Sequence, residues 1–268
     1  MNIWTDDPTE VRYHMLRPAE ARSRRESFPV AYVPLGTLEW HGPHNPLGSD
    51  TLQAEGIAVI AARLAGGLVL PPLYYGEPRV GDQIVETLPE YQNRQIAEAM
   101  GLNASNFDDD RFPAARAEQD AHYHALLLHI LYEAQSLGFK VCIFAAGHYP
   151  LINPANKAAE TFNARPNAMK AWAFVDYQLL RGRYTYAGDH AAYWETSHMA
   201  ALYPHRVDLS LLPERGQPLV GISVTEGHLP QDADPAFGYR IMLEAAQMIA
   251  DKARELIQSP APSCVADD

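Results

Sequence analysis

Short apolar segments alternate with long amphipathic ones along this chain, and this alternation constrains the fold more than any other feature. The first apolar segment, FPVAYVPLG (28–36), is a predicted strand that ends at a glycine, and residues 51–67 then show helical spacing of apolar side chains. The same pairing returns where a predicted helix over 121–139 runs directly into a predicted strand over 140–148. Strands that alternate with helices are typical of βαβ units and a parallel sheet.

The rest of the chain extends this pattern. The further predicted strands cover 67–76 and 167–177, and the further predicted helices cover 153–165 and 235–258. The segment from Glu77 to Arg116 has weak periodicity, and we expect an irregular excursion or a lid there. We therefore predict a single-domain three-layer α/β/α fold with a mainly parallel sheet over residues 1–258, followed by a disordered tail over 259–268.

Composition and charge exclude several classes of function. The 268 residues are 47% hydrophobic, which is enough for one sizeable core. The net charge of −12 argues against a nucleic-acid partner and against an anionic membrane surface. We see neither an apolar run of about 20 residues nor a signal peptide, and two cysteines do not make a disulfide scaffold. We therefore expect a cytoplasmic protein that acts on a small molecule.

Three polar clusters follow predicted strands at their carboxyl ends. EWHGPH (39–44) follows the first strand, and GHYP (147–150) follows the strand over 140–148. GDHAAYWETS (188–197) follows the strand over 167–177 after a short intervening stretch. Because ligands of open α/β sheets bind beyond the carboxyl ends of the strands, we expect the three clusters to form one site.

These clusters contain the residue types that bind divalent metals. Glu39 and His41 are two residues apart, so they point the same way on an extended backbone. Asp50, His148 and Glu195 add two carboxylates and a second imidazole. Such mixed ligands suit Zn²⁺, Mn²⁺ or Fe²⁺ rather than Ca²⁺. Two such ions about 3.5–4 Å apart could activate water and polarise a carbonyl group.

Each of these residues also has a purely structural interpretation. Glu39 could lie on the surface, His41 could cap a turn, and Asp50 could be the N-cap of the helix that follows it. Glu195 could favour the dipole of a helix in its first turn, and His190 could be a hydrogen-bonded core imidazole. Taken singly, the spacing favours these interpretations. Burying several acids and imidazoles together, however, requires a compensating charge, which favours a metal site.

The same segments resemble the creatininase (creatinine amidohydrolase) family. PLGTLEWHGPHNPLGSD (34–50) resembles the family signature P-x-G-S-x-E-Q-H-G-P-H-L-P-L-x-T-D. SLGFKVCIFAAGHY (136–149) resembles the family's helix, strand and N-G-H loop, and GDHAAYWETS (188–197) resembles its D-x-H-A-G-x-x-E-T-S motif. PAFGYRIMLEAAQMIADKA (235–253) resembles its closing helix. The four motifs stand in the family's order and cover most of the chain.

The resemblance implies a creatininase-like fold and a metal-dependent hydrolase of C–N bonds in cyclic or formyl amides. It further implies a homo-oligomer, often a hexamer. Carried over residue by residue, it places Glu39, Asp50 and His148 on one metal ion. It places His41 and the shared Asp50 on a second. The expected metal is Zn²⁺, with Mn²⁺ and Fe²⁺ as alternatives, at one or two ions per chain.

The resemblance also implies roles in catalysis and substrate binding. His190 would act as an acid/base group, and His190 or Glu195 would deliver a proton to the leaving nitrogen. Tyr149 and Trp194 are candidate walls of the substrate pocket.

The chain departs from the family pattern at several positions. The replacements are Trp40 for Gln, Asn45 for Leu, Ala146 and Leu151 for Asn, and Ala192 for Gly. Pro150 stands where creatininases carry a Glu that ligates the second metal, so that metal would need Glu195 here. The family's middle motif is not recognisable in GEPRVGDQIVETLPEYQNRQ (76–95). Two alternatives therefore stay open: a lactone hydrolase or sugar-type isomerase with the same metal site, and a non-catalytic paralogue.

Overall fold

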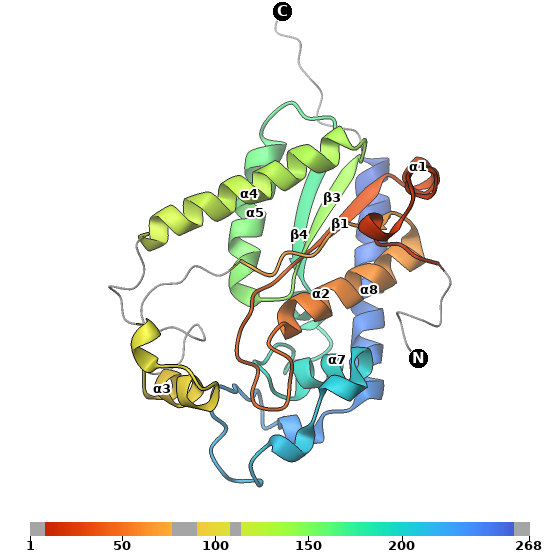
Figure 1. Cartoon of the computed structure of the whole chain (residues 1–268). Coiled ribbons are helices and arrows are strands. Elements are labelled where there is room, and N and C mark those ends of the chain that lie inside the picture. The colour runs from red at the N-terminus through yellow and green to blue at the C-terminus, as the bar shows by residue number, and fades with distance from the viewer. Residues whose placement is uncertain (1–8, 77–89, 108–113, 260–268) are drawn as a thin grey trace, which may run out of the picture.

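The computed structural model describes residues 9–76, 90–107 and 114–259 (Figure 1). Its centre is a sheet of four strands in the order β2–β1–β3–β4, in which all neighbouring strands are parallel. The strands are β1 (Val30–Leu35), β2 (Leu68–Val69), β3 (Val141–Ala146) and β4 (Lys170–Val175). The predicted mainly parallel sheet is therefore confirmed.

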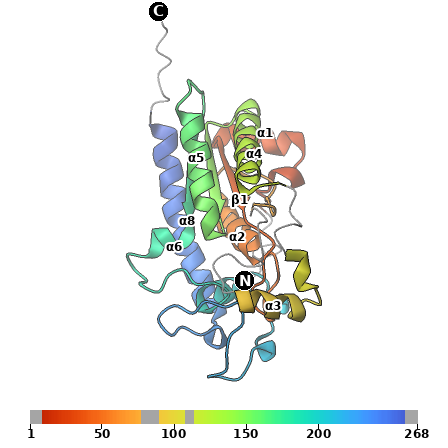
Figure 2. The same ribbon diagram turned by 90° about the vertical axis from the view of Figure 1, so that its left-hand side faces the viewer.

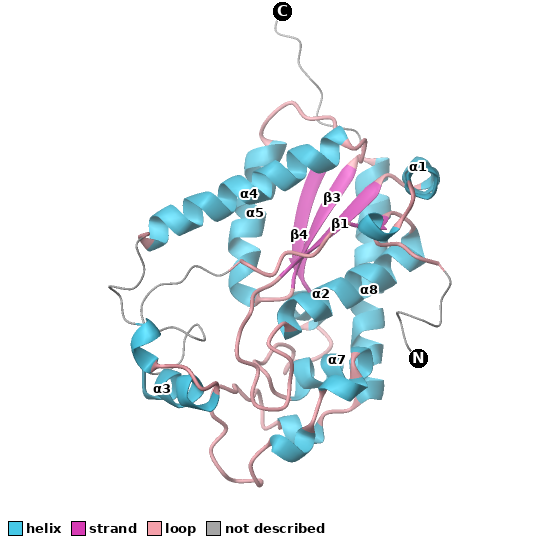
Figure 3. Cartoon of the chain, in the orientation of Figure 1, coloured by secondary structure: helices cyan, strands magenta, loops and turns pink. Residues whose placement is uncertain are grey.

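Helices cover both faces of this sheet. One face packs against α2 (Ser49–Ala65), α6 (Asp176–Leu180), α7 (Tyr193–Leu202) and α8 (Pro235–Gln258), and the other against α1 (Pro18–Ser27), α4 (Arg116–Ser136) and α5 (Ile152–Asn163). Successive strand residues alternate between the faces, so Val30 and Tyr32 contact the first set of helices while Ala31 and Val33 contact the second. Figure 3 shows the strands with α4 and α5 on one side and α2 and α8 on the other, and Figure 2 looks onto the side of α4 and α5. This arrangement confirms the predicted single-domain three-layer α/β/α fold.

The edge strand β2 is shorter than its sequence predicts. We expected a strand over 67–76, whereas β2 has two residues. Pro71 and Pro72 follow almost at once, and a proline has no N–H with which to continue the ladder. The chain returns to the edge of the sheet at an isolated bridge between Leu35 and Leu73.

We expected an irregular excursion or a lid over 77–116, but part of this segment is helical. It contains α3 (Glu90–Ala99), which buries Ile96 and Ala97 in a small cluster with Trp40. Outside the described residues lie 77–89, 108–113 and the predicted tail from residue 260 onward. Of the helices that the structure describes, none has the length and apolar character needed to cross a lipid bilayer.

Candidate metal centre

The three polar clusters meet at the carboxyl edge of the sheet, as their positions after predicted strands led us to expect. The loop after β1 carries Glu39 and His41, and His148 stands two residues after the end of β3. His190 and Glu195 come from the segment that follows β4 and α6 and leads into α7. Within the described ranges, these residues and Asp50 form three overlapping groups of potential metal ligands.

Two glycines allow the first turn of α2 to bring Asp50 to this edge. A Cβ atom at Gly147 would overlap the carbonyl group of Asp50, and a Cβ at Gly36 would overlap Thr51. The N-cap position of α2 is Gly48, so the N-cap interpretation of Asp50 is wrong. The buried carboxylate of Asp50 instead reaches toward His41 and His148.

The first ligand group contains Glu39, Asp50 and His148, which are all buried. The Nδ1 atom of His148 lies 3.2 Å from Glu39 Oε2 and 3.2 Å from Asp50 Oδ2. Both oxygens are buried and accept no hydrogen bond from the described residues. A buried carboxylate oxygen without a donor is costly, so two of them facing one imidazole nitrogen fit a divalent cation held between the three atoms.

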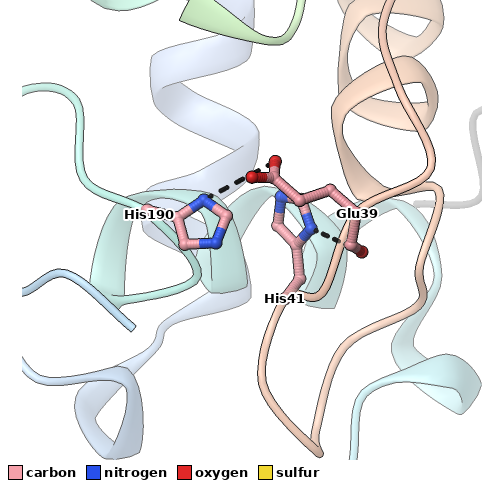
Figure 4. Close-up of side chains that lie close together, drawn as sticks. All are labelled: Glu39, His41 and His190. Atoms are coloured by element: carbon pink, nitrogen blue, oxygen red, sulfur yellow. Dashed lines mark hydrogen bonds and ion pairs between the residues drawn. The ribbon is translucent and has the colours of Figure 1, made fainter. Parts of the chain in front are cut away.

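The second ligand group contains His41, Asp50 and Glu195. The Nε2 atom of His41 lies 3.0 Å from Asp50 Oδ1 and 3.4 Å from Glu195 Oε2. The Nδ1–H of His41 donates to the backbone carbonyl of Glu39 at 3.2 Å (Figure 4), which leaves the lone pair on Nε2. Asp50 therefore offers one oxygen to each group, and the donor set fits two divalent cations.

The electrostatics of the two imidazoles agree with this arrangement. Burial by itself lowers the pKa of His41, but Asp50 and Glu195 raise it well above its ordinary value. Burial likewise lowers the pKa of His148, but Glu39 and Asp50 raise it. Without a metal, protons on these imidazoles would supply the positive charge that the carboxylates require.

The ring of His190 faces the carboxylate of Glu39, beside His41 (Figure 4). Its Nε2–H donates to the carbonyl of Trp40 at 2.9 Å, and its backbone pairs with Ser223 through two hydrogen bonds. Its Nδ1 lies 3.9 Å from Glu39 Oε2 and 4.0 Å from Glu195 Oε2. His190 also completes the third ligand group with Glu39 and His41.

Sequence reasoning missed the residues that hold Glu195 in place. The amide Nε2 of Gln53 donates to Glu195 Oε1 at 3.3 Å, while the Oε1 atom of Gln53 accepts from His198 Nδ1 at 2.8 Å. Asp189 accepts hydrogen bonds from the N–H groups of Trp194 and Glu195 at the start of α7. Gln53 could have been found from the sequence, because it lies three residues after Asp50 at the start of a predicted helix, and residues three apart lie on the same face of a helix.

An open cavity of about 810 Å³ leads to the ligand groups, and Glu39, His148, His190 and Glu195 line it. Tyr149 is half exposed and lines this cavity, and its role in substrate binding stays a prediction. Trp194 is not in the wall.

Trp194 lies in the core, so the expectation that it forms a pocket wall is wrong. Its side chain is 1% exposed, and its indole N–H donates to Asp176 Oδ2 at 3.1 Å. The indole also packs edge-on against Phe237 of α8. Its position next to Glu195 in sequence is therefore misleading, because neighbouring residues of a helix point in different directions.

Two departures from the family pattern have visible structural roles. Trp40 donates its indole N–H to the carbonyl of Val220 at 3.1 Å and packs against α3. Pro150 lies in a 3-10 turn before α5, and Glu195 supplies a carboxylate on the other side of the site.

Comparisons with known structures agree with the fold. A creatininase crystal structure is 21% identical and covers 94% of this chain and 100% of its own, with a TM-score of 0.64. A manganese creatininase is 20% identical with the same coverage and a TM-score of 0.67. A putative creatinine amidohydrolase from Bacteroides fragilis is 20% identical, covers 96% of this chain and 100% of its own, and gives a TM-score of 0.66.

Comparisons of sequence give one relative and one family model. A 3-dehydro-scyllo-inosose hydrolase from Thermotoga maritima is 32% identical over 69 residues, which is 26% of this chain and 22% of that protein. The match thus spans about a fifth of that relative's length. The family model described as creatinine amidohydrolase matches residues 14–259. Because this match spans nearly the whole chain, the chain belongs to the creatininase family.

Proposed function

We propose that this protein is a metal-dependent amidohydrolase that cleaves a C–N bond in a cyclic amide or formamide. The observation that supports it most is the placement of Asp50, whose two oxygens face two separate sets of buried ligands. Membership in the creatininase family supports an enzyme of hydrolase type.

The proposed ligands are those that the resemblance implies, with one addition. Glu39, Asp50 and His148 would hold one ion, and His41, Asp50 and Glu195 would hold the other. Zn²⁺ is the proposed metal, with Mn²⁺ and Fe²⁺ as alternatives, because the set mixes imidazole and carboxylate without thiolate. When bound, such ions make water a nucleophile at neutral pH and polarise a carbonyl group.

His190 is the proposed acid/base group. The carbonyl of Trp40 holds the proton on Nε2, so the Nδ1 atom faces the carboxylates with a free lone pair. It can take a proton from the attacking water and pass it to the leaving nitrogen. Burial raises the pKa of Glu195, but the neighbouring His41 lowers it by more, so the net shift is downward. Glu195 is therefore a poor proton donor at neutral pH. We therefore assign the proton transfer to His190 alone.

Metal analysis and a substrate panel test this function. We expect one or two ions per chain after reconstitution with Zn²⁺ or Mn²⁺, together with turnover of cyclic amides or formamides. Less than one ion per chain would contradict the proposal, and turnover of lactones alone would reject the amidase reaction. Sedimentation equilibrium on the same sample tests the homo-oligomer, often a hexamer, that the resemblance implies.

A second candidate is the hydrolysis of a substrate without a scissile C–N bond. The Thermotoga maritima relative favours it, because that protein is named a 3-dehydro-scyllo-inosose hydrolase. The panel should therefore include this compound beside the amides and lactones. Its turnover in the absence of amide hydrolysis would favour the second candidate.

Replacing His190 with Asn should separate catalysis from metal binding. We expect an unchanged metal content and a fall in kcat of about a hundredfold to ten-thousandfold, the usual contribution of a general acid–base group. The exposed His205→Asn variant is the matched control. A His190→Asn enzyme that keeps its kcat would exclude His190 from proton transfer.

Replacing Gln53 with Ala should weaken the second ligand group selectively. The substitution removes the donor to Glu195 Oε1, and losing such a supporting contact typically costs about tenfold to a hundredfold in metal affinity. Chelator competition should show one weakened ion and one unchanged ion per chain. The exposed Gln247→Ala variant on α8 is the control, and two unaltered affinities would contradict the assignment.

Metal binding should weaken as the pH falls. The carboxylates raise the pKa values of His41 and His148 well above 6.5 despite burial, so an incoming ion must displace protons even at neutral pH. We expect the apparent affinity to fall about tenfold per pH unit for each displaced proton. Calorimetry in buffers of different ionisation enthalpy measures the proton release, and binding without proton release would disagree with the expectation.

A further inference from the structure

The wall of the cavity carries two cations that have no carboxylate partner among the described residues. They are Lys157 of α5 and Arg181, which directly follows α6. Arg116 in the same wall, by contrast, pairs with Asp120 at 3.9 Å. Both side chains are exposed, and what they share is a place in one concave wall of a chain that has 33 acidic and 21 basic residues.

Arg181 is held against the wall by an aromatic ring. Its guanidinium carbon lies 5.0 Å from the centre of the Tyr177 ring, and this ring lies 5.4 Å from that of Tyr149. Both tyrosines also line the cavity. Stacking uses the face of a guanidinium and leaves the N–H groups at its edge available to a ligand.

Lys157 stands on the wall formed by α4 and α5. It lies four residues after Asn153 on α5, and both line the cavity. Lys157 and His124 of α4 line the same cavity, and burial of His124 together with the positive charge of Lys157 lowers the pKa of His124. The two cations therefore reach the cavity from different elements.

The lining of the cavity carries charges of both signs. Glu39 and Glu195 belong to the ligand groups, whereas Lys157 and Arg181 belong to none of them. The carboxylates fit the proposed metal ions, but metal binding gives no role to the two cations. Cations in a concave wall increase the local concentration of anions and fix their position.

We propose that Lys157 and Arg181 bind an anionic group of the substrate, a carboxylate or a phosphate. The inference rests on the proposed function, since it places the scissile amide at the ligand groups and the anion against the wall. The substrate class is then an acidic amide rather than a neutral one.

Three matched probes test the charge requirement. N-Formylglycine carries a carboxylate, N-formylaminomethylphosphonate carries a phosphonate, and N-ethylformamide has no charge. We expect calorimetry to show that the purified protein binds at least one charged probe about tenfold more tightly than the neutral one. The probe that binds more tightly shows whether the two cations prefer a carboxylate or a phosphate-like group. Equal binding of all three probes, or no measurable binding of either anion, would overturn the proposal.

Variants assign the effect to the two cations. Lys157→Gln and Arg181→Gln should each weaken the preferred anion about threefold to tenfold and leave the neutral probe unchanged. The controls are Lys140→Gln, outside the cavity, and Arg240→Gln, whose guanidinium carbon lies 5.2 Å from the Phe237 ring centre in a similar stack. Losses of the same size in the controls would also overturn the proposal.

These outcomes can be told apart from failure of the proposed function. Metal content and formamide hydrolysis are measured on the same samples, and binding affinities do not depend on turnover. A protein that binds the anions but holds no metal would reject the hydrolase and retain the anion subsite. A protein that holds metal and cleaves only neutral amides would support the hydrolase and reject the anion subsite.

Discussion

Replacing Asp50 with Asn is expected to remove both metal ions at once, because each oxygen of this carboxylate faces a different ligand group. The metal content should fall from about two ions per chain to near none. Hydrolysis should fall at least about a thousandfold, equivalent to about 4 kcal/mol of lost transition-state stabilisation. Elemental analysis and initial rates on the panel substrate with the highest turnover measure both effects.

Glu55→Gln is the matched control for this experiment. Glu55 is a buried carboxylate of the same helix and belongs to none of the described ligand groups. Glu39→Gln and Glu195→Gln should each lose one ion only, because each belongs to one of the two groups assigned to metal. An Asp50→Asn protein that is folded by circular dichroism and still holds two ions would exclude Asp50 as the shared ligand.

Replacing Gly147 with Ala is expected to destabilise the whole fold. The added Cβ would overlap the backbone carbonyl of Asp50, and neither β3 nor the first turn of α2 can move without disturbing the buried sheet. We expect a loss of about 3 kcal/mol or more in the free energy of unfolding. Urea unfolding followed by circular dichroism should show the fall in the midpoint.

Gly182→Ala is the control for this loss. No heavy atom lies within 4 Å of a Cβ built at Gly182, and the residue does not have a positive φ. This variant should therefore unfold at the midpoint of the unmodified protein or slightly above it. If Gly147→Ala were equally stable, α2 would not need its close approach to the end of β3.

The sequence allowed the prediction of most of the fold and of the grouping of the site residues. Strands β1, β3 and β4 are strongly apolar, and each polar cluster follows one of them, so the rule for the carboxyl edge sufficed. The length of the edge strand β2 was overestimated because apolar residues continue to residue 75, whereas the strand ends at Val69, before Pro71. Helix α3 was missed because it is anchored by a distant residue, Trp40, which no local pattern shows.

The side-chain environments were harder to predict than the positions. Trp194 adjoins Glu195 in sequence, yet it points into the core toward Asp176. Gln53 contacts Glu195 from a helix far away in the chain, and its role follows from the packing of α2 against α7. Contacts between distant elements depend on tertiary packing, which short-range periodicity does not record.

The positions of the strands also set the order in which a growing chain can assemble the centre. All four strands end by Val175, and Glu39, Asp50 and His148 precede that residue, whereas Glu195 and the covering helix α8 follow it. During synthesis, the first ligand group can form while only α2 and α6 cover the face of the sheet that α7 and α8 later complete. The second ligand group, and burial of that face, wait for the last third of the chain, so maturation of the centre coincides with completion of the core.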